Sequence, residues 1–157
     1  MADDAREQLA AIARRWVEEG WCAGDGSRPA GSIVDELHAP DFIDHDSGGR
    51  AADNAGFREG IVRLLGAFPD LAAAARDVVV EPDPTCAGAS GAIVSGTVAV
   101  RWTAVGTHRG AYLGAEPTGK RITFKGIEVI RVRGERITER WGEWDGLELL
   151  GQLGRGF

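Results

Sequence analysis

The side chains of this sequence best suited to chemistry are the carboxylate of Glu128 and the imidazoles of His45 and His108. Around Glu128 apolar residues alternate, so a strand would place Phe124 and Ile130 on the same face as the carboxylate. A carboxyl group among apolar side chains is harder to ionise than one in water, which suits it to proton transfer near neutral pH. We therefore predict that Glu128 is the catalytic acid/base, with the two histidines as further catalytic candidates.

Glu128 also has a structural interpretation. Buried acidic side chains commonly bind a backbone donor or an arginine, and then they only hold a sheet together. A similar choice exists for His108, which ends a strand-like segment in the motif GTHRG. A histidine at a strand end is as often a hydrogen-bonded structural residue as part of a site. The residues alone leave these alternatives open.

A tight turn at Gly134 and Glu135 joins two expected strands, RITFKGIEVIRVR and RITERWGEW. A two-residue hairpin turn with glycine first fits this spacing. Counting outward from the turn predicts three cross-strand pairs: Val132 with Ile137, Ile130 with Glu139, and Glu128 with Trp141. The predicted contact between Glu128 and Trp141 depends on this register, because a slip of one residue would turn every side chain to the other face.

The opposite face of this hairpin is predicted to be a mixed charged and apolar surface. Its expected members are Arg131, Arg133, Arg136, Arg140, Val129 and Trp144. Such a surface can meet another subunit or face solvent. We expect self-association.

Aromatic side chains on the expected strands can line a pocket. Trp102 lies on the apolar face of its strand, and it is predicted to bind substrate together with Trp141, Phe124 and Ile130. Tryptophan rings can stack on a flat aromatic substrate. They can equally be ordinary core residues.

Three helices are expected before the first clear strand. The first covers about residues 3 to 23 and has an apolar stripe in which Trp21 is predicted to belong to the core. The second lies in SIVDELHAP with Ser32 as its cap, and the third begins with Asn54 as its cap.

Strand-like runs follow at DVVVEPD, at AIVSGTVAVRWTAVGTH and in the hairpin, and a short helical tail is expected near LELLGQL. Helices first and sheet second are typical of an α+β fold. We predict a curved antiparallel sheet packed on the N-terminal helices, with a pocket between the two layers.

Length and composition limit the classes of function. The 157 residues are expected to form one domain, 1–157, and 43% hydrophobic with 27% charged residues is ordinary for a globular protein. The net charge of -6 argues against a nucleic-acid partner, since no cluster of basic and aromatic residues offsets it.

The sequence carries no signal for targeting, cofactors or metals. Acidic residues stand in MADDAREQLAAIARRW where a signal peptide needs bases, and no apolar run is long enough to span a bilayer. Cys22 and Cys86 are isolated and expected to be buried thiols, which predicts neither a disulfide nor a zinc site. Phosphate-loop, dinucleotide-binding and nucleophile-elbow motifs are missing. We expect a cytoplasmic protein that contacts no membrane and uses no cofactor or metal.

Four motifs in this order resemble a known family: HAPDFIDHD, GTHRG with EPTGK, GIEVIRVRGERITERW, and WDGLELLGQLG. Together they resemble the SnoaL-like polyketide cyclases of the nuclear-transport-factor-2-like superfamily, over nearly the whole chain. The resemblance implies a cone-shaped α+β fold, a deep apolar cavity, and homodimers or homotetramers formed through the outer sheet face.

The resemblance also implies site residues. In family cyclases an aspartate is the acid/base for an intramolecular aldol closure of a polyketide ester, without metal or organic cofactor, and its matching position here is Glu128. Glutamate departs from the family pattern because its carboxylate lies one methylene farther out. His45 resembles a family histidine at the cavity rim, where it would orient or polarise a substrate carbonyl, although it can also be a structural loop residue. Asp44 and Asp46 flank His45, but neighbours on an extended loop point apart, which argues against metal chelation.

Two classes of function are compatible with these features. The first is a cofactor-independent enzyme that takes a proton from an activated carbon of a hydrophobic, polyketide-like substrate and allows ring closure. A hydroxylase or isomerase using the same pocket is a related alternative. The second class is a carrier that binds a hydrophobic small molecule without chemistry, since one fold can serve both roles.

Overall fold

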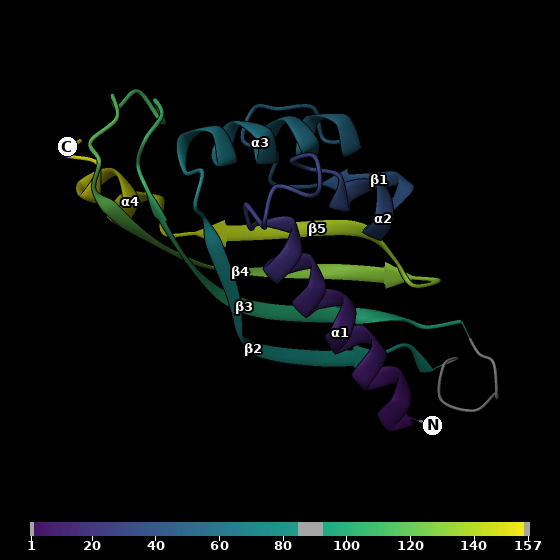
Figure 1. Cartoon of the computed structure of the whole chain (residues 1–157). Coiled ribbons are helices and arrows are strands. Elements are labelled where there is room, and N and C mark those ends of the chain that lie inside the picture. Colours follow the sequence, from purple (N-terminus) through teal and green to yellow (C-terminus); the bar gives the residue numbers. More distant parts are fainter. Residues whose placement is uncertain (1, 85–92, 156–157) are drawn as a thin grey trace.

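The computed structural model of the chain describes residues 2–84 and 93–155 (Figure 1). In chain order the elements are α1 (Ala2–Gly20), α2 (Ile33–Leu37), β1 (His38–Asp44), α3 (Asn54–Ala67), β2 (Ala72–Pro82), β3 (Ser95–Thr107), β4 (Arg121–Arg133), β5 (Arg136–Trp144) and α4 (Gly146–Gln152). The strands form one curved, open sheet in the order β1-β5-β4-β3-β2. The predicted α+β class, with N-terminal helices packed on the sheet, is confirmed.

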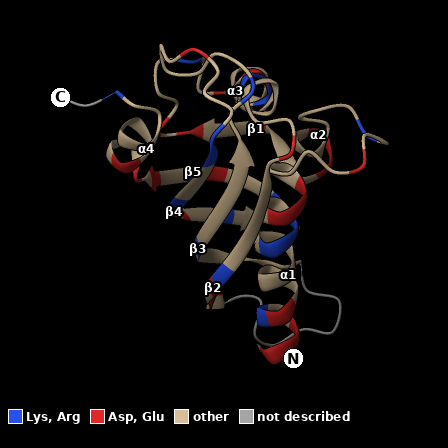
Figure 2. Ribbon diagram, turned by 60° about the vertical axis from the view of Figure 1, so that its left-hand side comes forward, with Lys and Arg blue, Asp and Glu red and all other residues tan. Residues whose placement is uncertain are grey.

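Helix α1 packs across β2 and β3, and its apolar stripe explains why it forms there. Leu9, Ala13 and Trp16 follow one another at helical spacing, and all three have no exposed surface. Acidic and basic residues occupy the remaining faces of the helix (Figure 2). No helix of the described residues has both the length and the hydrophobicity needed to cross a membrane.

The prediction that three helices precede every strand is wrong. Helix α2 ends at Leu37, and His38–Asp44 form the edge strand β1, which pairs with β5 in parallel. Pro40 is compatible with this position, because an edge strand does not need every backbone N–H. The sheet is therefore mixed rather than wholly antiparallel.

Two predicted helix caps differ from the structure. Asp53, not Asn54, caps α3, and its side chain accepts a hydrogen bond from the backbone N–H of Gly56 at 2.9 Å. The Asn54 side chain instead donates to the carbonyl of Ala39 at 2.8 Å. Ser32 precedes α2 as predicted, but its side chain makes no capping hydrogen bond.

The turn between β4 and β5 is the predicted two-residue turn. Both of its residues have positive φ, 59° for Gly134 and 65° for Glu135, which matches the type I′ turn of tight hairpins. The predicted pair Val132 with Ile137 is confirmed.

Beyond that pair a β-bulge at Thr138 changes the register. Arg131 lies opposite Glu139, so β5 has one extra residue at this point. The predicted pairs Ile130 with Glu139 and Glu128 with Trp141 are therefore wrong. Glu128 lies opposite Gly142, and Ile130 lies opposite Arg140.

Within residues 2–84 and 93–155, the side chains between helices and sheet form two hydrophobic clusters. The larger includes Trp16 and Phe57 and lies under α1 and α3, whereas the smaller surrounds Phe68 near α4. Trp102 packs against both clusters.

The cysteines were expected to be buried thiols. Cys22 is half-buried, and its sulfur accepts a hydrogen bond from the backbone N–H of Ala73 at 3.1 Å. Burial raises the pKa of the Cys22 thiol. Cys86 lies outside the described residues.

Candidate active site

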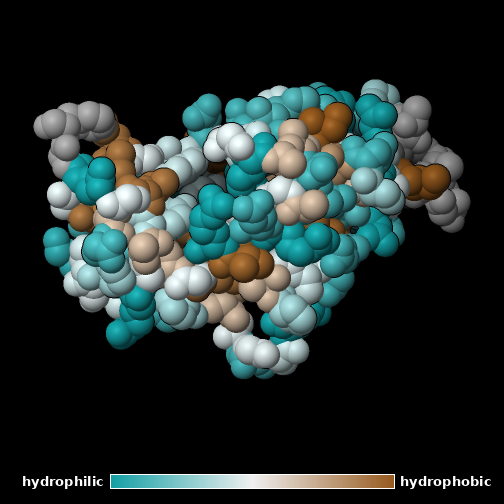
Figure 3. Space-filling view, turned by 90° about the horizontal axis from the view of Figure 1, so that it is seen from above, coloured by the Kyte–Doolittle hydropathy of each residue, from teal (hydrophilic) through white to brown (hydrophobic). Residues whose placement is uncertain are grey.

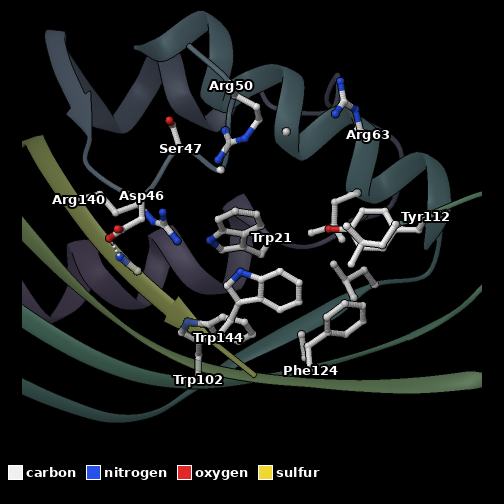
Figure 4. A pocket seen from close by; sticks show the side chains of 17 residues that line it. Trp21, Asp46, Ser47, Arg50, Arg63, Trp102, Tyr112, Phe124, Arg140 and Trp144 are labelled. Carbon is white, nitrogen blue, oxygen red and sulfur yellow. Dashed lines mark hydrogen bonds between the residues drawn. The ribbon is translucent and has the colours of Figure 1, made fainter. Parts of the chain in front are cut away.

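A cavity of about 260 Å³ lies between α3 and the inner face of the sheet (Figure 4). Much of its wall is aromatic or aliphatic, contributed by Trp21, Trp102, Trp144, Tyr112, Phe124, Leu64, Leu71 and Leu113. Seen from above, the molecular surface is largely hydrophilic, with separate hydrophobic areas (Figure 3). A flat hydrophobic ligand would find its contacts inside the cavity.

One end of the cavity is polar. Asp46, Ser47 and Arg50 reach it from the segment between β1 and α3, and Arg140 reaches it from β5 (Figure 4). Among the described residues that line the cavity, Asp46 alone carries a carboxylate. The site therefore combines an aromatic chamber with a small group of charges.

Glu128 is buried, with 1% of its surface exposed, and belongs to a chain of charges. Its Oε2 accepts a hydrogen bond from Arg140 Nε at 2.5 Å, and Arg140 Nη1 donates to Asp44 Oδ1 at 3.0 Å. Asp44 Oδ2 in turn accepts from Arg50 Nη2 at 3.1 Å. Two carboxylates and two guanidinium groups thus alternate, and their charges balance.

The prediction of an unpaired carboxylate in apolar surroundings is wrong, although Glu128 is on the predicted inner face. Arg140 was expected on the outer face, but the bulge turns it inward beside Glu128. Burial by itself would lower the pKa of the Arg140 guanidinium, but the charges of Glu128 and Asp44 raise it overall. The contact agrees with the structural interpretation of Glu128.

Aromatic rings hold the two arginines in place. The guanidinium carbon of Arg140 lies 5.1 Å from the ring centre of Phe57, and that of Arg50 lies 5.3 Å from the same centre. Arg140 also lies 6.0 Å from the ring centre of Trp21. Such cation–π contacts fix the orientation of a guanidinium group.

His45 lies on the outer face of the sheet, at the end of β1. Its ring stacks on Trp141 with 4.4 Å between ring centres, and its Nε2 lies 3.0 Å from Glu139 Oε2. Neither His45 nor Trp141 lines the cavity. The structure thus separates these two predicted site residues from Trp102 and Phe124, which do line it.

His108 and Ile130 are both completely buried and do not line the cavity. His108 Nδ1 accepts a hydrogen bond from the backbone N–H of Thr118 at 3.1 Å, and its ring stacks on Phe68. Ile130 belongs to the larger hydrophobic cluster. The position of His108 matches its structural interpretation, whereas the prediction that Ile130 binds substrate is wrong, because its side chain is packed in the core.

His38 is a buried titratable residue that sequence reasoning missed. Its Nδ1 lies 2.9 Å from Asn54 Oδ1, and its ring stacks on Phe42. Burial lowers the pKa of His38 to about 4, partly offset by the hydrogen bond to Asn54. The motif HAP before an unrecognised strand gave no sign of this environment.

Sequence reasoning also overlooked two glycines that mark where other side chains approach the hairpin strands. Gly126 and Gly142 interrupt the two hairpin strands, and a glycine inside a strand often marks a close approach by another group. A Cβ on residue 126 would lie 2.6 Å from Trp102 Cζ2. A Cβ on residue 142 would lie 2.1 Å from Arg140 Nη2. Trp21, predicted to be core, is partly buried and lines the cavity.

The described residues contain no group of three or more His, Cys, Asp and Glu side chains placed to hold a metal ion. A comparison with curated protein sequences finds no match. The sequence profile of one family, the SnoaL-like polyketide cyclases, matches residues 11–92 and 90–153.

Solved structures provide a second comparison. IdmH from Streptomyces antibioticus, provisionally assigned as a polyketide cyclase, is 28% identical, with a TM-score of 0.69 over 94% of this chain and 98% of that chain. TsrD from Streptomyces laurentii is 23% identical, with a TM-score of 0.71 over 97% and 96%. AclR from Streptomyces galilaeus, provisionally assigned as a hydroxylase, is also 23% identical, with a TM-score of 0.68 over 99% and 83%.

Proposed function

Because the chain belongs to the SnoaL-like polyketide cyclase family, we propose that it is a cofactor-independent enzyme that closes a ring in a hydrophobic, polyketide-like substrate. The observation that carries this proposal is the aromatic cavity with a fixed group of charges at one end. The similarity to IdmH supports the same reaction class.

The cavity suits carbanion chemistry. A substrate carbon next to a carbonyl loses a proton, and the resulting enolate carbon attacks a second carbonyl in the same molecule. A positive group near the enolate oxygen lowers the barrier most where water is scarce. Arg140 is that group in our proposal, because it belongs to the buried charge network and also lines the cavity.

Glu128 then acts through Arg140. Its carboxylate lies behind the guanidinium group and does not line the cavity, so we propose that it positions Arg140 rather than touching substrate. His45 and His108 have no substrate contact in this proposal, since both are held by other residues of the chain.

A direct test uses aromatic polyketide esters as substrates. Ring closure by aldol addition gives a product of unchanged mass that separates chromatographically, so liquid chromatography with mass spectrometry detects it. We expect turnover by the wild type and a loss of about 100-fold or more in Arg140→Lys, because lysine keeps the charge but not the planar set of donors. Turnover by the wild type that Arg140→Lys leaves unchanged would contradict the role of Arg140.

A carrier function is the second candidate, because Glu128, His45 and His108 are all engaged in contacts within the chain. Native mass spectrometry of freshly purified protein would reveal a retained small molecule. A carrier keeps that molecule chemically unchanged through repeated binding and release, whereas an enzyme converts it. Oxygen incorporation into a product would instead indicate a hydroxylase.

We also propose self-association through the outer face of the sheet. Ile127 of β4 is 52% exposed there. The centre of an interface between subunits is typically apolar, with a polar and charged rim around it, and Ile127 among charged neighbours fits this arrangement. Light scattering during size-exclusion chromatography would show a dimer or tetramer, and Ile127→Glu would reduce it to the monomer.

A further inference from the structure

Gly142 of β5 lies between two charged side chains at the polar end of the cavity. Its backbone N–H donates to Asp46 Oδ2 at 2.8 Å. On the face that a side chain would occupy, a Cβ would lie 2.1 Å from Arg140 Nη2. All three residues line the cavity. Because glycine has no side chain, the Asp46 carboxylate and the Arg140 guanidinium group can both lie against residue 142 at the cavity wall.

Arg140 has one nitrogen left for a ligand. Nε donates to Glu128 and Nη1 donates to Asp44. Nη2 has no hydrogen-bond partner within the described part of the chain. Because the other two nitrogens are held by buried carboxylates, the direction of Nη2 is fixed before any ligand binds.

Asp46 is fixed in a comparable way, with one oxygen left over. Its backbone N–H donates to Asp44 Oδ1 at 3.2 Å, and Gly142 holds its Oδ2. Across residues 2–84 and 93–155, Oδ1 has no hydrogen-bond partner and the carboxylate forms no ion pair. Asp46 is exposed, so a ligand in the cavity can reach it and displace water from it.

We infer that Asp46 and Arg140, which meet at Gly142, are a catalytic pair: Asp46 removes a proton from the carbon next to a ligand carbonyl, while Arg140 Nη2 binds the carbonyl oxygen. The inference rests on the proposed function, since it takes the ligand to be a hydrophobic carbonyl compound in this cavity. It assigns the proton transfer to the carboxylate that lines the cavity rather than to Glu128.

The proposed step is a balanced proton transfer. An oxygen of Asp46 forms a bond to the proton as the C–H bond breaks. The released electron pair forms the C=C bond of the enolate, and the carbonyl π electrons move to the oxygen, which accepts a hydrogen bond from Arg140 Nη2. After the enolate carbon forms a C–C bond to a second carbonyl, Asp46 returns the proton to the new alkoxide.

Proton exchange tests this pair without requiring ring closure. The probe is 2-tetralone, a flat bicyclic ketone, incubated with the protein in D₂O and followed by loss of its C1 proton signal in NMR. We expect the wild type to accelerate exchange about 100-fold or more over buffer, as a positioned general base does. Asp46→Asn and Asp46→Ala should return exchange to the buffer rate, while Asp41→Asn, which changes an exposed acid on β1, should leave the acceleration intact.

Further variants separate catalysis from positioning. Gly142→Ala should lower the acceleration about tenfold or more, because it displaces Nη2, and Gly66→Ala should not, since a Cβ there meets nothing within 4 Å. Glu128→Gln should lower the rate but keep the wild-type dependence on pD, because the proton acceptor is unchanged. Circular dichroism confirms that each variant is folded.

Three results would overturn the inference: no acceleration by the wild type, acceleration that survives both Asp46 substitutions, or a pD dependence that changes with Glu128→Gln. The proposed function can fail separately. If exchange depends on Asp46 but no polyketide ester is cyclised, the pair stands and ring closure is wrong. If cyclisation survives Asp46→Asn, ring closure stands and the catalytic pair is wrong.

Discussion

Strand β5 carries a charged cluster on each face, and the two clusters differ in burial. The inner cluster consists of Glu128, Arg140, Asp44 and Arg50, and the outer cluster consists of His45, Glu139, Arg131 and Trp141. The side chains of the inner pair Arg140 and Glu128 are 9% and 1% exposed, whereas those of the outer pair His45 and Glu139 are 35% and 29% exposed.

This difference shows that similar residue types serve different purposes on the two faces. Breaking a buried ion pair leaves a charge without water or partner, which costs about 3–5 kcal/mol. An exposed pair contributes about 0–1 kcal/mol, because water screens it. The inner cluster can therefore hold a cavity wall rigid, and the outer cluster cannot.

The largest expected effect is that of Arg140→Met. This change leaves Glu128 and Asp44 buried without a shared cation, and we expect the free energy of unfolding to fall by about 3–5 kcal/mol. Urea denaturation measures it. Arg131→Met, the matched change in the outer cluster, should cost about 1 kcal/mol or less. Equal losses of unfolding free energy in the two variants would show that the inner and outer clusters do not differ in their contribution to stability.

The second prediction uses His38, which is buried beside the inner face. Its pKa is about 4 in the fold, below the ordinary 6.5, so between these values the unfolded chain binds a proton that the folded chain does not. Stability should therefore fall as the pH drops from 6.5 to 4, by roughly 3 kcal/mol from this residue.

The matched variants for this pH effect are His38→Phe and His45→Phe. Replacing His38 should flatten the decrease in unfolding free energy between pH 6.5 and pH 4, measured by urea denaturation at each pH. Replacing His45 on the outer face should leave the contribution of His38 in place. An unchanged pH profile in His38→Phe would show that the buried imidazole is not its source.

A third prediction concerns the space beside Arg140. Gly142→Ala places a methyl group against the guanidinium group, and overpacking of this kind typically costs about 1–3 kcal/mol. Gly66→Ala in α3 should be neutral or stabilise by up to about 1 kcal/mol, because alanine favours helix and the site is open. Thermal or urea unfolding measures the stability of both variants. A Gly142→Ala protein as stable as the wild type would contradict the predicted clash with Arg140.

The smallest expected effect is that of Glu139→Gln. It removes the exposed ion pair to Arg131 and alters the contact with His45, and we expect a change of about 1 kcal/mol or less that shrinks further in high salt. Unfolding at low and high ionic strength measures both quantities. A loss as large as that of Arg140→Met would mean that the outer cluster is also structural.

The sequence predicted the elements of the hairpin well, because their signals are local. Alternation fixed the inner face of β4, including Glu128, and the glycine turn fixed Val132 opposite Ile137. The bulge at Thr138 could not be predicted, since threonine is an ordinary strand residue. That one residue exchanged the faces of Arg140 and Trp141.

The candidate site was harder to predict because its parts come from distant segments. Trp102 and Phe124 were recognised from strand periodicity, and both line the cavity. Asp46 and Arg50 were not recognised, since they reach the site only because β1 pairs in parallel with β5, about 100 residues later in the chain. Such a long-range parallel pairing leaves no local pattern.

The most direct test of the account is a crystal structure with 2-naphthol, the stable planar analogue of the enol of 2-tetralone. The account predicts the rings among the tryptophans of the cavity, the oxygen within about 3.2 Å of Arg140 Nη2, and the adjoining ring carbon facing Asp46. A ligand bound outside the cavity, or inside it with the oxygen directed away from Arg140, would contradict the central claim.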